Sequence, residues 1–144
     1  MKPATPPLIA ASLQEWHRIV TAGDPAALPA LLHPDVVFRS PVAFKPYRGA
    51  ATVALILRTV FGVFSGFAYE RQFVTAEGFD VALEFRARVG ERDVKGIDLI
   101  RFDAAGRIVD FEVMIRPASG LAALANEMGR RLAAAMPAGG PAES

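Results

Sequence analysis

The 144-residue sequence contains no cysteine and only two histidines. Disulfides and thiolate metal sites are therefore excluded, and cysteine usage says nothing about the redox compartment. The two histidines, His17 and His33, lie apart and no carboxylates cluster near them, so the sequence offers no recognisable set of metal ligands. Phosphate-binding loops and nucleophile elbows are missing as well. We expect neither a metal nor a cofactor.

Long apolar runs and a strong charge excess are also missing. The sequence has no segment of about 18 apolar residues, which argues against a membrane span, and its N-terminal stretch lacks the apolar centre of a signal peptide. The net charge is +1 and the basic residues are scattered, so no electrostatic footprint for nucleic acid is present. These absences predict a cytoplasmic protein that binds neither a membrane nor nucleic acid.

What the chain does contain is typical of one soluble globular domain. Apolar residues make up 52% of it and charged residues 22%, and a chain of this length buries roughly 68% of the surface that it exposes when unfolded. Three prolines within residues 1–11 predict a flexible N-terminal arm. We expect residues 12–136 to form the domain and residues 137–144 to be a disordered tail.

Helical signals come first along the chain. Ser12 and Glu15 match a capping box, Gly23 ends that helix, and Asp24-Pro25 begins a second, short one. Further on we expect a turn at 33–35, a strand over 36–41, a helix over 50–64, strands over 69–76 and 79–89, and a last helix beginning near 119. Helices followed by a run of antiparallel strands indicate the α+β class, and a curled sheet with helices in its hollow would enclose an apolar pocket.

The most informative stretch is a predicted hairpin over residues 92–116. Its strands flank the four-residue loop Asp103–Gly106, and pairing Phe102 with Arg107 places Asp98 opposite Phe111. One face then carries Val94, Asp98, Ile100, Phe102, Val109, Phe111, Val113 and Ile115. Asp98 is the only charge on this face, and a carboxyl in apolar surroundings needs a partner, a water or a reason to stay protonated.

The opposite face of the hairpin is mixed. Apolar residues stand among its charges at Ile97, Leu99, Ile108 and Met114. Such a face is too apolar to be left in water, so we predict a homodimer that packs through the sheet.

The order of several short motifs resembles the nuclear transport factor 2-like superfamily, and within it the SnoaL-like and ketosteroid isomerase-like members. The motifs are the segment His33–Pro41, the strand Gly96–Phe102 and the turn Gly106–Val109, and the likeness extends over about residues 12–117. It implies a cone-shaped, curved antiparallel sheet with the N-terminal helices in its concave face and a C-terminal helix. It also implies an apolar pocket and a homodimer.

The catalytic residues of ketosteroid isomerases carry over only in part. Those enzymes use a tyrosine, an aspartate base and a protonated aspartate. The matching positions here hold Trp16, Ser40 and Asp98. Tryptophan donates one hydrogen bond but is not an acid, and an unactivated serine does not take a carbon-bound proton at pH 7.

Other members of the superfamily match no better. SnoaL-like cyclases commonly have a histidine and an aspartate in the last strand, where this chain has Phe111 and Val113. Limonene epoxide hydrolases have an arginine two residues before the strand aspartate, where this chain has Gly96.

Two functions remain open. The first is an isomerase, dehydratase or cyclase acting on a small apolar molecule of polyketide or steroid type, with Asp98 as its catalytic proton donor or acceptor. The second is a non-catalytic module that binds a small ligand or a partner. The retained Asp98 favours the first and the missing base favours the second. In either case we expect the pocket to be lined by Trp16, Phe38, Ser40, Phe61, Phe85, Phe111 and Val113.

Overall fold

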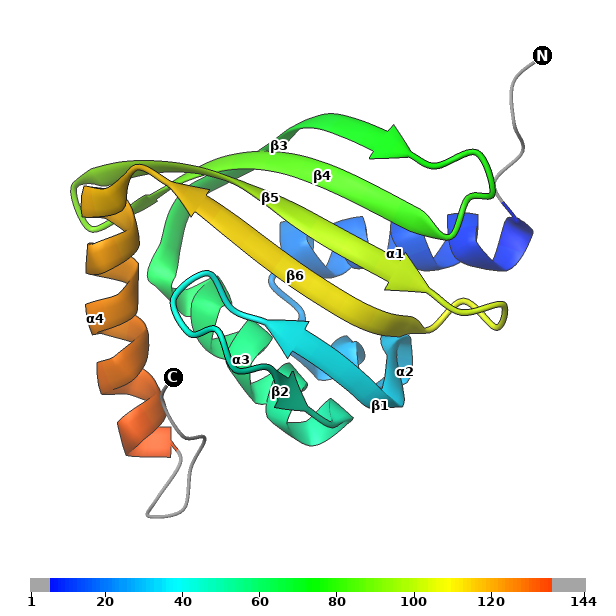
Figure 1. Cartoon of the computed structure of the whole chain (residues 1–144), viewed down its shortest axis with the longest axis horizontal. Helices are drawn as coiled ribbons and strands as arrows, with labels where there is room; N and C mark the ends of the chain where they lie inside the picture. The colour runs from blue at the N-terminus through cyan, green and yellow to red at the C-terminus, as the bar shows by residue number, and fades with distance from the viewer. Residues whose placement is uncertain (1–5, 136–144) are drawn as a thin grey trace.

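The computed structural model describes residues 6–135, and these form an α+β fold (Figure 1). Its elements are α1 (Pro7–Ala22), a 3-10 turn η1 (Pro25–Ala27), α2 (Leu28–Leu31), β1 (Leu32–Arg39), β2 (Tyr47–Arg48), α3 (Ala50–Val63), β3 (Phe64–Val74), β4 (Asp80–Val89), β5 (Arg92–Phe102), β6 (Ile108–Arg116) and α4 (Ala118–Ala135). The predicted α+β class is confirmed, with α3 lying between the first two strands and the last four and α4 following the strands.

The strands form one sheet in the order β2-β1-β6-β5-β4-β3. The neighbours from β6 to β3 are antiparallel, as is β2 with β1, but β1 runs parallel to β6. The sheet is therefore mixed: it is antiparallel as predicted, except at the pairing of β1 with β6. Sequence periodicity cannot reveal this parallel pairing, because β1 and β6 are far apart in the sequence.

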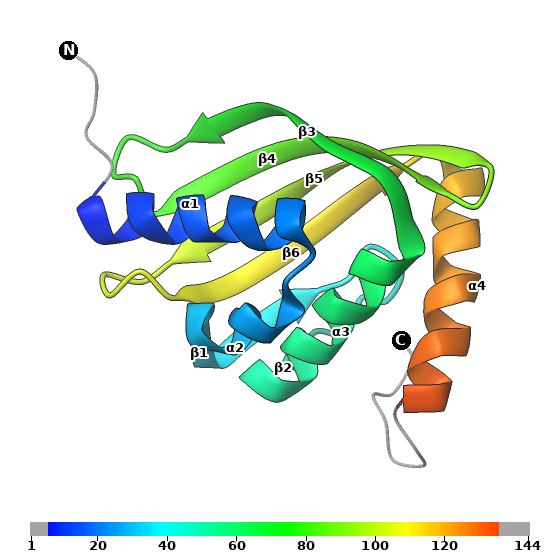
Figure 2. The ribbon, with the colours of Figure 1, turned by 180° about the vertical axis from the view of Figure 1, so that it is seen from behind.

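The helices cover one face of the curved sheet. Figure 2 shows α1, α2 and α3 against the same face, while α4 stands at the side, next to α3. The four N-terminal apolar residues Ile9, Leu13, Trp16 and Ile19 follow helical spacing and are all buried. They share one core cluster with the inward residues of β4, which alternate along the strand at Val81, Leu83, Phe85, Ala87 and Val89.

The first helix begins earlier than predicted. It starts at Pro7, so residues 7–11 of the expected arm are helical, and Ile9 is fully buried. Proline is favoured in the first turn because it has no N–H to leave unpaired. Ser12 is not a cap, since its hydroxyl donates to the carbonyl oxygen of Gly106. Residues 1–5 of the predicted arm and the predicted tail lie outside the described residues.

Two strands are also longer than expected. The segment predicted as a turn at 33–35 belongs to β1, which pairs with β6 at Leu32 and again from Val37, with an irregularity between the two. The irregularity explains why the local pattern looked like a turn. Strand β3 begins directly after α3, five residues ahead of the predicted start at Tyr69.

The register of the β5–β6 hairpin differs from the prediction. Asp98 faces Val113, and Phe111 faces Ile100. Two changes combine: Phe102 pairs with Ile108 in place of Arg107, and Val109 is an extra residue at a bulge next to the turn. Together they displace the pairing by two residues, which leaves the faces of the later residues unchanged. Ile108, predicted to face outward, is fully buried.

The outer face of the sheet carries cross-strand ion pairs. Glu84 is only 6% exposed, and both its oxygens accept hydrogen bonds from Arg71, at 2.7 and 2.6 Å. Lys95 lies 3.6 Å from the same carboxylate. These cations hold the pKa of Glu84 down at about 2, with the hydrogen bonds from Arg71 as the largest cause.

Candidate functional site

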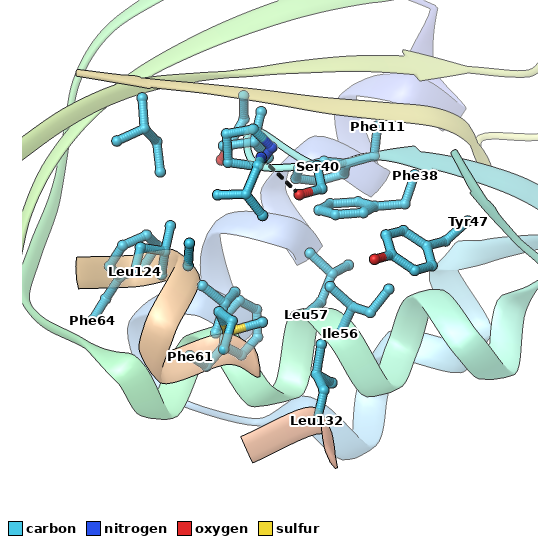
Figure 3. Close-up of a pocket in the computed structure, with 18 of the residues that line it drawn as sticks. Phe38, Ser40, Tyr47, Ile56, Leu57, Phe61, Phe64, Phe111, Leu124 and Leu132 are labelled. Carbon is cyan, nitrogen blue, oxygen red and sulfur yellow. Dashed lines mark hydrogen bonds between the residues drawn. The ribbon is translucent and has the colours of Figure 1, made fainter. Parts of the chain in front are cut away.

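A cavity of about 570 Å³ lies between the sheet and the helices, within the size range of small-molecule sites (Figure 3). Its lining is mostly apolar. The aromatic residues that line it are Trp16, Phe38, Tyr47, Phe61, Phe64, Phe67, Tyr69 and Phe111. Figure 3 shows Leu57 of α3 below Phe38, with Leu124 and Leu132 of α4 further from Phe38 and Phe111.

Asp98 is the only carboxyl that lines this cavity among the described residues. It comes from β5 and is 6% exposed. Burial raises its pKa from 3.8 to about 7, and a hydrogen bond from Tyr69 acts in the opposite direction. At neutral pH the carboxyl is therefore present in both its charged and its neutral form.

The two oxygens of Asp98 have different surroundings. Oδ2 accepts a 2.6 Å hydrogen bond from the hydroxyl of Tyr69. Oδ1 has no hydrogen-bond partner within residues 6–135, yet no polar side-chain atom in that range is both fully enclosed and unpaired. Oδ1 must therefore be in contact with open space, and the space beside it is the cavity. The carboxyl thus presents one oxygen to a ligand.

Tyr69 is held by a second hydrogen bond. The indole Nε1 of Trp16 donates to its hydroxyl oxygen at 2.9 Å, so a chain of hydrogen bonds runs from α1 through β3 to β5. Burial is the main reason why the pKa of Tyr69 is raised well above its usual value, and the charge of Asp98 adds to it. Tyr69 consequently stays neutral and acts as a donor to Asp98.

Sheet register brings these side chains together. Tyr69 pairs with Phe85, and Phe85 pairs with Gly96 on the next strand. Asp98 is two residues from Gly96 and therefore points to the same face, one step further along. Trp16 reaches them from α1, where its ring packs edge-on against Phe111 at 5.1 Å.

Ser40 lies just after β1, beside Phe38 and Phe111 (Figure 3). Its hydroxyl oxygen accepts hydrogen bonds from the backbone N–H groups of Val42, at 3.0 Å, and Ala43, at 3.3 Å. This local turn fixes the side chain. The hydroxyl hydrogen is not used in these contacts, so Ser40 can donate to a ligand oxygen.

Most of the residues predicted for the pocket come together in it. Asp98 and six of the seven predicted binding residues line the cavity: Trp16, Phe38, Ser40, Phe61, Phe111 and Val113. Phe85 does not. It is buried behind Phe67, whose ring stacks on it at 4.9 Å and 23°. Strand alternation correctly placed Phe85 on the inner face of the sheet. It does not show whether a residue on that face reaches the cavity or is covered by another side chain.

Sequence reasoning missed Tyr69, Phe67 and Tyr47 as lining residues, and the contribution of α4. Phe67 and Tyr69 are two residues apart on β3, and this spacing was the sequence signal that could have identified them as neighbours on one face of the strand. The pattern shows that the two share a face, but only the tertiary fold shows that Tyr69 meets Asp98.

Neither histidine lines the cavity. His17 packs edge-on against the ring of Tyr69 at 5.2 Å and lies 2.9 Å from the amide oxygen of Gln72. His33 accepts a hydrogen bond from the backbone N–H of Asp35. No group of three or more potential metal ligands occurs within residues 6–135.

Comparison with known proteins places this geometry in a family. The model of the SnoaL-like domain matches residues 13–111. The chain belongs to the SnoaL-like family. No curated protein sequence matches it, and no helix between residues 6 and 135 is long and apolar enough to cross a bilayer.

Solved structures agree with the SnoaL-like assignment. A steroid delta-isomerase from Pseudomonas aeruginosa shares 60% sequence identity, with a TM-score of 0.90 over 94% of this chain and 98% of that chain. An uncharacterised protein with a cystatin-like fold from Silicibacter pomeroyi DSS-3 shares 40% identity, with a TM-score of 0.80 over 84% of each chain. An NTF2-like protein from Mesorhizobium loti, at 21% identity and a TM-score of 0.69, covering 78% of this chain and 93% of that chain, shows the same fold.

Proposed function

We propose that this SnoaL-like protein is an isomerase that moves a proton, and with it a carbon–carbon double bond, on an apolar ketone of steroid or polyketide type. The observation that carries the proposal is Asp98, the one carboxyl within residues 6–135 that faces the cavity, with its pKa near 7. A general acid–base group is most effective when its pKa lies near the working pH, because both of its forms are then available.

The reaction needs one group that takes a proton and returns it. Ionised Asp98 would remove a proton from the carbon between the ketone and the double bond, and the electrons of that C–H bond would form a dienolate with its charge on oxygen. Neutral Asp98 would then return the proton to the far carbon of the dienolate, and the electrons would flow back to restore the carbonyl. One carboxyl is sufficient for both steps.

The other polar groups of the cavity have supporting roles. The Ser40 hydroxyl would donate to the oxygen that becomes negative, a contact that strengthens as the charge develops. Tyr69 holds Oδ2 and so directs Oδ1 toward the substrate, and Trp16 in turn holds Tyr69. The identity shared with a steroid delta-isomerase supports the substrate class.

The direct test offers the purified protein a β,γ-unsaturated steroid ketone and follows the ultraviolet absorbance of the conjugated product. We expect turnover by the unmodified protein and its loss in Asp98→Asn. Asp110→Asn is the matched control, because Asp110 is a carboxyl on the outer face that pairs with Arg39, and it should retain the full rate. A rate in Asp98→Asn equal to that of the unmodified protein would refute the proposal.

A non-catalytic binding protein is the second candidate, and Ser40 favours it. Both polar contacts of the Ser40 oxygen are with backbone N–H groups, so it has no base to activate it among the described residues. A binding protein would change its Trp16 fluorescence with the ketone but would not exchange the ketone's α-hydrogens for deuterium. Ser40→Asp adds a second carboxyl and would then create activity that the unmodified protein lacks.

A further inference from the structure

Helix α4 carries small residues where it faces the cavity. Ala125, Gly129 and Ala133 all line the cavity and follow one another at four-residue intervals, which places them on one side of the helix. The span from the first to the third is about 12 Å along the helix axis. Larger side chains, among them Leu124 and Leu132, border this row.

Packing does not explain the glycine in the middle of the row. A glycine in a helix interior destabilises it by roughly 0.5–1 kcal/mol relative to alanine. At Gly120, on the same helix, the glycine is needed, because an added Cβ would collide with Cγ1 of Val94. At Gly129 an added Cβ would meet no atom within 4 Å. The space next to Gly129 is thus open, and Gly129 is an exposed residue of the cavity lining.

A length limit also needs a polar group that fixes one end of the ligand, and Asp98 provides it. Its Oδ1 contacts the cavity while the rest of the residue is buried. A ligand whose ketone end lies between Asp98 and Ser40 can extend its apolar body into the part of the same cavity that α4 lines. Figure 1 shows α4 running away from the sheet beside α3, so a longer ligand would extend along the row of small residues.

We propose that α4 sets the length of ligand that the cavity accepts, and that Gly129 is the position that determines it. The ligand class is a rigid, apolar, multi-ring ketone whose far end lies over Ala125, Gly129 and Ala133. This inference rests on the cavity and the polar end assigned under the proposed function, but it concerns binding and does not require turnover.

Three saturated ketones provide the test: one with a single ring, one with two fused rings and one with four fused rings. Trp16 is the only tryptophan of the chain and lines the cavity, so its fluorescence reports binding of these ketones, which do not absorb in the same range. At pH 6 most Asp98 is neutral, so the carboxyl places no full charge beside the apolar ligand. We expect Gly129→Leu to weaken binding of the four-ring ketone at least tenfold and binding of the one-ring ketone less than threefold.

Matched variants separate length selection from damage to the fold. Ala134→Leu introduces the same side chain at an exposed position of α4 that does not line the cavity, and should leave all three affinities within twofold. Ala133→Leu, within the row, should reproduce the length dependence. Gly129→Ala should retain four-ring binding and raise the melting temperature, because it removes a helix glycine without filling the space.

The outcomes are distinct from those of the isomerase test. Equal weakening of all three ketones by Gly129→Leu, or no weakening of any, would overturn the inference, as would a failure of the unmodified protein to bind the four-ring ketone. Binding with the expected length dependence but without turnover would retain the inference and reject the isomerase.

Discussion

The hydroxyl of Tyr69 donates to Oδ2 of Asp98 at 2.6 Å, and this contact opposes the effect of burial on the acid. Burial favours the neutral carboxyl, whereas a donor hydrogen bond favours the carboxylate. The balance leaves the pKa of Asp98 at about 7. The same contact directs the other oxygen to the cavity, so Tyr69 acts on both the orientation and the proton affinity of Asp98.

Tyr69→Phe should therefore raise the pKa of Asp98 above 7, because the interaction that lowers it is lost. The carboxyl signals of isotopically labelled protein, followed by NMR against pH, measure this directly. Tyr47→Phe removes a hydroxyl from another cavity residue and should leave the Asp98 titration where it is. An unchanged or lower pKa in Tyr69→Phe would contradict the assigned role of Tyr69.

Asp98→Asn should make the protein less sensitive to pH. The folded pKa is above the ordinary value of 3.8, so the unfolded chain releases this proton first. The native state then loses stability as pH rises from 3.8 to about 7, by roughly 4 kcal/mol in all. Asparagine cannot ionise, so the variant should match the unmodified protein near pH 4 and exceed it at pH 8 in urea denaturation. A large loss of stability at pH 8 would mean that the carboxylate is structurally paired.

Glu84→Gln should show the opposite pH dependence. Its folded pKa of about 2 is below the ordinary value of 4.5, so its contribution is present above 4.5 and disappears as pH falls toward 2. The variant should be less stable than the unmodified protein at pH 7, and the difference should shrink in acid. A pH-independent difference would indicate that shape, and not charge, is what Glu84 provides.

Phe85→Ala should lower the free energy of unfolding by about 3–5 kcal/mol, the usual effect of deleting a core aromatic ring. The ring is fully buried and contacts Phe64, Phe67 and Tyr69. Phe73→Ala, at a ring that is 54% exposed, serves as the control and should change stability far less. An unmoved denaturation midpoint for Phe85→Ala would show that β4 does not direct this residue inward.

We also propose a homodimer that packs through the outer face of the sheet. Met114 is 52% exposed there, and Ile97 and Leu99 are half-buried. Light scattering at micromolar concentration should give twice the 15.4 kDa of the chain, and Met114→Glu should shift the mass toward the monomer. A monomeric mass for the unmodified protein would refute this proposal.

The sequence predicted those parts of the site that depend on alternation within one element. Asp98 was recognised because it interrupts an otherwise apolar strand face, and its burial follows from that face alone. The partner Tyr69 could not be identified in this way, since the contact joins β3 to β5 through β4 and depends on register across two pairings.

The errors in the fold have equally local causes. Val109 is one additional residue in a strand, and its effect on pairing is not encoded in hydrophobic periodicity. The start of α1 was misjudged because prolines were interpreted as a break, although Ile9, Leu13 and Trp16 already had helical spacing upstream and downstream of Ser12. Ile108 was predicted to face outward because the predicted register was incorrect.

The parallel pairing of β1 with β6 has a consequence for how the chain folds. Arg39 and Asp110, which form an ion pair across these strands, are 71 positions apart, whereas the hairpins from β3 to β6 join neighbouring segments. Closing so long a loop loses more chain entropy than closing a hairpin, and contacts of large sequence separation slow folding. We therefore expect the meander β3–β6 to form first and β1 to dock onto it last, so that the wall of the cavity carrying Phe38 is completed in the final step.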